Sequence, residues 1–233
     1  GNVSGEKVLH VKKESRRIYK EYRTSAKLTS IKLIGVAGLC SGAGTTQMCI
    51  MLAVFMGKVL KKKTAVAGDE VTYSLMLRQM QKVSAIQHKG IASRHAYSMD
   101  GIDYYCGIRD EDIGILRQKY DVIILDISFE NTFDNTNVTF ARMVSRLSAC
   151  DEKILAGSML PWKSRECEKK MERIERFLDI RGLKMVTLAA CDKEAVSIIK
   201  KHGVEVVLIP FERNPFVISG ENLRSFLELL KIT

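Results

Sequence analysis

A run of small residues from Gly38 to Gln47, "GLCSGAGTTQ", is the stretch of this chain best suited to binding an anion. It follows the apolar run "SIKLIGVAG", which is typical of a buried strand, and precedes an apolar segment typical of a helix. Small residues let the backbone curl so that successive amides point inward, and the N-terminal end of the helix adds positive potential. The stretch indicates a phosphate-binding loop, with a tight turn that binds no ligand as the alternative.

The spacing within this loop distinguishes two phosphate-binding patterns. The dinucleotide pattern G-x-G-x-x-G fits poorly, because its third glycine would fall on Gln47. The P-loop pattern G-x-x-x-x-G-K-[ST] fits better when it is anchored at Gly44, although its first glycine falls on Leu39 and its lysine on Thr45. It then places the magnesium-binding hydroxyl on Thr46. The candidate phosphate-binding residues are Ser41, Gly42, Ala43, Gly44, Thr45 and Thr46.

Carboxylates follow two of the apolar runs. Asp126 comes near the end of "YDVIILDIS", where it could hold a metal ion with Thr46 or only cap a strand. Asp69 and Glu70 follow "TAVAG", and they could bind magnesium through water or begin a helix. No histidine stands beside a serine or cysteine in a recognisable nucleophile motif, so the candidate chemistry is that of phosphate and metal.

Composition favours a large core and anionic partners. The chain has 233 residues, of which 46% are hydrophobic, and no apolar run reaches the roughly 20 residues that span a bilayer. The net charge is +10, and residues 1–30 carry eight basic against three acidic side chains, hence +5. This basic stretch is either a solvated linker or a surface that binds acidic groups.

The six cysteines form no C-x-x-C pair, which favours buried, reduced thiols.

Apolar runs and helical patterns alternate from Ser30 onward. This alternation predicts an α/β fold with a doubly wound, mostly parallel seven-stranded sheet and the loop at the carboxyl end of a central strand. Residues 84–100 fit neither pattern, and no second domain is evident after a basic N-terminal arm at 1–29. The expected strands cover residues 30–38, 63–70, 101–108, 121–128, 152–159, 183–191 and 204–210. The expected helices cover residues 44–63, 72–82, 110–120, 135–150, 163–180, 193–203 and 220–232.

Three segments, "CSGAGTTQ", "YDVIILDIS" and "VEVVLIPFERNPF", resemble the MinD/ParA class of P-loop ATPases. Within that class the likeness is nearest to the TadZ/CpaE-like branch tied to pilus assembly, and it covers about residues 30–233. The resemblance implies ATP or ADP with Mg²⁺, a metal at Thr46 and Asp126, and a base beside Pro210 and Phe211. It also implies a bacterial, cytoplasmic protein that forms a homodimer and reaches the inner membrane surface through protein partners.

The loop departs from this class in its charges. The family sequence is K-G-G-V-G-K-T-T, so Cys40 and Thr45 stand at the positions of both lysines, and Cys191 or Asp192 replaces an asparagine that reads the base. Losing one preorganised group that stabilises the transition state commonly costs about 3–4 kcal/mol. We therefore expect very slow or absent hydrolysis, as in a pseudo-ATPase that organises an assembly such as pilus or secretion machinery.

Two alternatives follow from the same residues. The protein could be an active ATPase whose missing lysine comes from elsewhere in the chain or from a partner subunit, with Lys193 and Arg213 as candidates. It could instead be a partitioning protein that binds nucleic acid through its net charge of +10, although no helix-turn-helix pattern supports this. Because Cys40 lacks the charge that reaches a partner's phosphates in the family, we also expect a dimer that forms without regard to ATP.

Overall fold

The computed structural model describes Arg17 and residues 31–80, 83–87, 90–91, 95–127, 137–188 and 192–230. The basic arm expected at residues 1–29 therefore lies outside the described residues, Arg17 excepted. Cys191 lies outside them as well.

One sheet of nine strands runs through the described residues, in the order β3-β4-β5-β2-β6-β1-β7-β8-β9. The seven strands from β5 to β9 in this order are paired in parallel and match the seven expected from the sequence. The mostly parallel α/β sheet is thus confirmed. The bounds of the strands are Leu33–Gly38 (β1), Thr64–Gly68 (β2), Ser84–Ala85 (β3), His95–Met99 (β4), Ile102–Cys106 (β5), Val122–Ile127 (β6), Glu152–Ala156 (β7), Lys184–Thr187 (β8) and Glu205–Leu208 (β9).

The expected number of seven strands was wrong, because β3 and β4 extend the sheet beyond β5 with antiparallel pairing. Both come from the segment 84–100, which matched no pattern. Asp100 and Gly101 join β4 to β5, with φ of 54° and 80°. Two successive residues with positive φ are characteristic of the tight turn of a hairpin, for which Asp-Gly is a strong sequence signal. That dipeptide could have revealed the hairpin.

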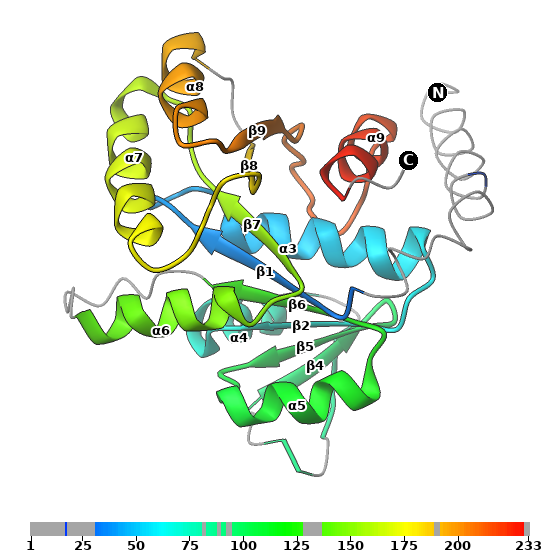
Figure 1. Ribbon diagram of the computed structural model, residues 1–233. Coiled ribbons are helices and arrows are strands. Elements are labelled where there is room, and N and C mark those ends of the chain that lie inside the picture. The colour runs from blue at the N-terminus through cyan, green and yellow to red at the C-terminus, as the bar shows by residue number, and fades with distance from the viewer. Residues whose placement is uncertain are drawn as a thin grey trace, which may run out of the picture.

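Helices cover both faces of the sheet (Figure 1): α3 and α9 lie on one face, and α5 and α6 lie on the other. The helices α7 and α8 pack against each other, and α8 contacts β9. Their bounds are Thr45–Val54 (α3), Glu70–Arg78 (α4), Asp110–Lys119 (α5), Asn137–Ser148 (α6), Pro161–Glu175 (α7), Lys193–Lys200 (α8) and Gly220–Leu229 (α9), and a π-helical turn, Phe55–Val59 (η1), continues α3.

The apolar sequence of α3 follows from its position between the sheet and α9. All residues from Met48 to Val54 are buried, and Phe55 stacks on Phe226 of α9 with ring centroids 5.3 Å apart. A helix covered on both sides needs no polar face. This packing fixes the start of α3, and hence the loop before it, against the centre of the sheet.

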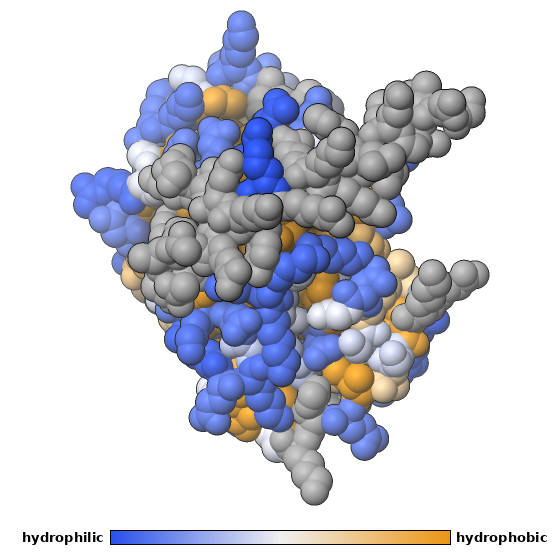
Figure 2. Space-filling view, turned by 90° about the vertical axis from the view of Figure 1, so that its right-hand side faces the viewer, coloured by the Kyte–Doolittle hydropathy of each residue, from blue (hydrophilic) through white to orange (hydrophobic). Residues whose placement is uncertain are grey.

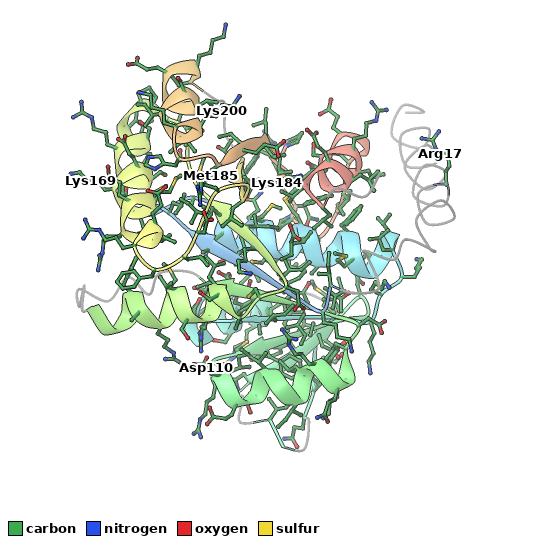
Figure 3. All side chains as sticks on the ribbon, viewed as in Figure 1. Arg17, Asp110, Lys169, Lys184, Met185 and Lys200 are labelled. Carbon is green, nitrogen blue, oxygen red and sulfur yellow. The ribbon has the colours of Figure 1, made fainter. Side chains whose placement is uncertain are left out.

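A buried lysine holds α9 to the sheet. Lys184 of β8 is 4% exposed, and its Nζ donates a hydrogen bond to the carbonyl oxygen of Glu228 near the end of α9 (Figure 3). A cation suits the negative end of a helix dipole. The interaction therefore explains why a charged residue is tolerated in a buried strand.

The surface on one side of the protein is mostly polar. Figure 2 shows that the described residues on the face at the right of Figure 1 are mainly hydrophilic, with apolar residues in small groups. Among the described residues, no helix combines the length and apolar character that crossing a membrane requires.

Candidate phosphate-binding site

The loop leaves β1 at the carboxyl edge of the sheet, between β6 and β7, as the sequence predicted. The amide of Leu39 donates to the carbonyl oxygen of Ala156 at 2.7 Å, which keeps the chain beside β7 for one residue more. Gly42 and Gly44 then take φ values of 72° and 78°, a left-handed conformation that glycine adopts without strain. The helix α3 starts at the next residue, so backbone amides converge at the N-terminal end of a buried helix.

Two glycines of the loop also make room for neighbouring side chains. A Cβ atom on Gly44 would lie 2.5 Å from Cδ1 of Leu188, and one on Gly38 would lie 2.7 Å from Oγ1 of Thr45. Thr45 is only 8% exposed, so its side chain is packed against the end of β1. Thr45, at the lysine position of the P-loop pattern, is therefore uncharged, and its side chain is too short to extend to a phosphate as a lysine would.

The structure brings together the two residues predicted to bind a metal ion. Oγ1 of Thr46 donates to Oδ2 of Asp126 at 2.7 Å. Asp126 lies near the end of β6, where it pairs with Val36 of β1, and it is 5% exposed. A hydroxyl and a carboxylate beside a phosphate loop are donors of the type that Mg²⁺ takes in nucleotide sites, where phosphates and water complete the shell. The donor set thus fits magnesium.

Tyr73 of α4 contacts the same carboxylate and was not predicted. Its hydroxyl donates to Oδ2 of Asp126 at 2.9 Å, in a buried position. Burial and the charge of Asp126 raise the pKa of Tyr73 well above its usual value, so the phenol keeps its proton and stays a donor. The ring lies on Gly68, where a Cβ atom would be 2.1 Å from Cε2 of Tyr73. A glycine ending β2 was the available signal, but it did not identify the partner.

Asp69, the first residue of the acidic pair after β2, caps a helix. Oδ1 of Asp69 accepts from the amide of Thr72 at 2.8 Å and caps α4. This contact favours the helix-start interpretation of Asp69 over the magnesium one. The side chain of Glu70 lies outside the described part of the chain.

Helix α7 brings charged side chains to the loop that the sequence did not reveal. Oε1 of Glu166 accepts from the amide of Ser41 at 3.1 Å, and Oε2 accepts from Nζ of Lys163 at 3.1 Å. Burial opposes ionisation of Glu166, but the hydrogen bonds from Lys163 and Ser41 lower its pKa. The carboxylate of Glu166 thus accepts the hydrogen bond of one loop amide, at a point where a phosphate oxygen could bind.

The same helix carries cations near Cys40, one of the two positions at which the family sequence has a lysine. Lys163 and Lys170 both interact electrostatically with Cys40 and with Glu166. Lys170 is half-buried, and burial lowers the pKa of its amine. These lysines are better placed to replace the loop charge than Lys193, which begins α8, or Arg213, which follows β9.

The segment expected to face a base is tied to the start of α3. Pro210 and Phe211 follow β9, and the next residue, Glu212, accepts through its carbonyl oxygen from Nε2 of Gln47 at 2.7 Å. Phe211 is 62% exposed, so its ring is available for stacking. Asp192, by contrast, accepts from the amide of Ala195 at 3.0 Å and caps α8. Asp192 therefore stabilises the start of α8.

No protein-family model and no curated protein sequence matches this chain. Solved structures do match. MinD in the MinC:MinD cell division complex of Aquifex aeolicus aligns with TM-score 0.53 and 15% identity, over 83% of this chain and 86% of its own. MinD of Pyrococcus horikoshii complexed with Mg-ADP aligns with TM-score 0.53 and 15% identity, over 86% and 95%. A ParA family ATPase of Chlorobium tepidum aligns with TM-score 0.52 and 15% identity, over 88% and 93%.

This chain has the fold of MinD and ParA. The match spans most of both chains and confirms the P-loop type of α/β sheet expected from the sequence. Identities of 15% show the fold alone, so the activity must be argued from the residues of this loop.

Proposed function

We propose that the protein binds ATP or ADP with Mg²⁺ through a degenerate P-loop and uses the bound state to organise a cellular assembly. The observation that carries this proposal is the contact of Thr46 with Asp126 at 2.7 Å, beneath a loop whose glycines have left-handed φ values. The Mg-ADP complex of MinD from P. horikoshii supports a magnesium nucleotide in a site of this fold.

Each part of the site has a separate task in this proposal. The amides from Ser41 to Thr46 bind the phosphates, and Thr46 and Asp126 hold the magnesium ion, which would neutralise phosphate charge. Pro210 and Phe211 cover the base, because an exposed ring next to α3 can stack on it. Lys163 and Lys170 supply positive charge from α7.

Hydrolysis is absent or very slow in the proposed function. Phosphoryl transfer depends mainly on positioning and on charge that stabilises the transition state. Thr45 is short and packed against β1, and Cys40 is neutral unless it loses a proton. The site would therefore hold a nucleotide without turning it over, as a switch or scaffold does.

The proposed assembly is made by protein contacts. MinD of A. aeolicus is found in a complex with MinC, which supports protein partners for this fold. The likeness of the loop and strands to TadZ/CpaE-like proteins favours pilus or secretion machinery at the inner membrane surface of a bacterium, reached from the cytoplasm through partners. Trp162, in the first turn of α7, and Phe177, which follows the end of α7, are 73% and 68% exposed. They are candidates for contact residues, including those of a homodimer.

One observation favours an active ATPase as a second candidate. The amine of Lys163 lies 3.1 Å from the carboxylate that occupies the amide of Ser41. If a phosphate displaced Glu166, the amine of Lys163 would be left close to that phosphate and could take the part of a loop lysine. Measured turnover separates the two candidates.

Magnesium-dependent ADP binding tests the proposed function. We expect calorimetry to show that the wild type binds Mg-ADP more tightly than ADP with a chelator, and that Asp126→Asn removes the difference. The control is Asp179→Asn, an exposed carboxylate that pairs with Arg181 after α7 and should leave binding unchanged. Failure of the wild type to bind ADP, or equal magnesium dependence in Asp126→Asn, would contradict the proposal.

A further inference from the structure

Two pairs of neighbouring residues bring the loop and α7 into contact. The amide of Ser41 donates to Glu166 at 3.1 Å, and the residues next to them in sequence, Cys40 and Cys167, interact electrostatically through their thiols. Sγ of Cys167 donates to the carbonyl oxygen of Ser158 at 3.7 Å, and the backbone of Ser158 interacts with Cys40 as well. The side chains of Cys40 and Cys167 therefore meet beside the backbone of Ser158.

The two thiols differ in character. The interaction with Cys167 is the largest influence on Cys40, and together with the Ser158 backbone and Lys163 it lowers the pKa of Cys40 to about 7, against the opposing effects of burial and of Glu166. Lys170 interacts with both thiols as well. The pKa of Cys167 is raised by its interaction with Cys40 and by burial. Cys40 is 7% exposed and Cys167 is fully buried, so Cys40 is both the better nucleophile and the more accessible one.

Two other described thiols, those of Cys150 and Cys49, lack this arrangement. Cys150 is buried, donates to the carbonyl oxygen of Arg146 at 3.2 Å, and has its pKa raised to about 12, chiefly by burial. Cys49 is fully buried, and its pKa is raised by burial and by the charge of Asp126. A structural thiol of this kind is inert, whereas a thiol of lowered pKa beside a second thiol is the usual form of a redox-sensitive pair.

We propose that Cys40 and Cys167 are a redox-sensitive pair that a hydroperoxide converts into a disulfide. The Cys40 thiolate attacks the peroxide, which yields a sulfenic acid on Cys40 and one molecule of water or alcohol. Cys167 then attacks that sulfur, loses its proton, and expels the hydroxyl as a second molecule of water. Two thiols are oxidised, one hydroperoxide is reduced, and a thiol reductant reverses the change.

The disulfide would act on the loop through its neighbours. It holds residues 40–41 against residues 166–167, and so keeps the carboxylate of Glu166 on the amide of Ser41. A phosphate that needs this amide would then bind more weakly. This consequence, unlike the disulfide itself, rests on the proposed function, because it requires that the loop bind phosphate.

Peptide mapping tests the pair directly. The reduced full-length chain is treated with hydrogen peroxide, its remaining thiols are alkylated with iodoacetamide, and the digest is analysed by mass spectrometry. We expect one intramolecular cross-link between Cys40 and Cys167, a mass lower by two hydrogen atoms, and full recovery with dithiothreitol. The Cys167→Ser variant should stop at a sulfenic acid on Cys40 that dimedone traps, and Cys150→Ser should still form the cross-link.

The outcomes separate this inference from the proposed function. Two results would contradict the proposed disulfide. In the first, Cys40 and Cys167 both remain available for alkylation after peroxide treatment. In the second, either residue forms a cross-link with another cysteine or with another molecule. ADP affinity is then measured for the reduced and the cross-linked wild type, and we expect the cross-linked form to bind several-fold more weakly. Equal affinity would overturn the effect on the loop. Absence of ADP binding in both forms would contradict the proposed function, while the mass spectrum alone would still decide the disulfide.

Discussion

The hydroxyl of Tyr73 donates a hydrogen bond to Oδ2 of Asp126 at 2.9 Å, and Thr46 donates to that same oxygen at 2.7 Å. Burying a carboxylate is costly unless it is hydrogen-bonded, and here two hydroxyls from different helices bond one of its oxygen atoms. The arrangement ties α4 to the two residues that we propose to hold the metal ion. A magnesium ion that binds Asp126 must share this carboxylate with Tyr73.

Replacing Tyr73 by phenylalanine should lower the free energy of unfolding by about 1.5–3 kcal/mol, because the variant loses a buried hydrogen bond to a charged group. The matched control is Tyr104→Phe. Tyr104 is packed 6.4 Å from Tyr73, between ring centroids, and its hydroxyl is buried with no hydrogen-bond partner among the described residues. Removing that hydroxyl should be neutral or stabilising. Urea unfolding measures both, and equal losses in the two variants would contradict the assignment.

Substituting alanine for Gly44 should destabilise the protein more than the same change at Gly42. Both glycines have positive φ, which costs other residues about 1–2 kcal/mol. A Cβ atom on Gly44 would also meet Leu188 at 2.5 Å, whereas one on Gly42 meets nothing within 4 Å. As a further control, Gly114→Ala in α5 has open space and should stabilise by about 0.5–1 kcal/mol. A Gly42→Ala loss equal to that of Gly44→Ala would rule out the packing argument.

Alkylation of Cys40 should depend on pH with a midpoint near 7. Iodoacetamide reacts with the thiolate, and the pKa of Cys40 is lowered to about 7 by its interaction with Cys167, with Lys163 and Lys170 facing it and Glu166 opposing. The alkylation rate of Cys40 should therefore increase as the pH rises through 7, and it should be low at pH values below 7. Peptide mapping at several pH values measures this, with Cys150 as the thiol that stays slow throughout. A midpoint near the ordinary thiol pKa of about 8.5 would show that the pair does not activate Cys40.

The seven parallel strands could be predicted because buried parallel strands are continuous apolar runs, as in "VIIL" before Asp126. The pairing of Thr46 with Asp126 followed from the loop spacing and from the position of the strand ends. The strand β4 is partly polar, so its hairpin with β5 was missed despite Asp100 and Gly101. Glu166 could not be predicted, because it meets Ser41 across 125 positions of sequence and no local pattern encodes such a contact.

Sedimentation velocity tests the expected dimer. In the family that the loop resembles, a lysine at the position of Cys40 reaches the partner's nucleotide, and this chain lacks that charge. We expect one and the same oligomeric state, a dimer, with and without Mg-ATP. A stable contact should bury more than about 1,000 Å² in total. A monomer that becomes a dimer only when Mg-ATP is added would contradict this expectation.

In the proposed function, the site holds a nucleotide without hydrolysing it. The most direct measurement incubates the wild-type protein with Mg²⁺ and ATP labelled at the γ-phosphate, then follows bound label and released phosphate over the same hours. We predict ATP that stays bound and intact, with turnover far below the value of about 1 per second found at the low end for working enzymes. Phosphate release near that value, or no bound label at all, would contradict the account.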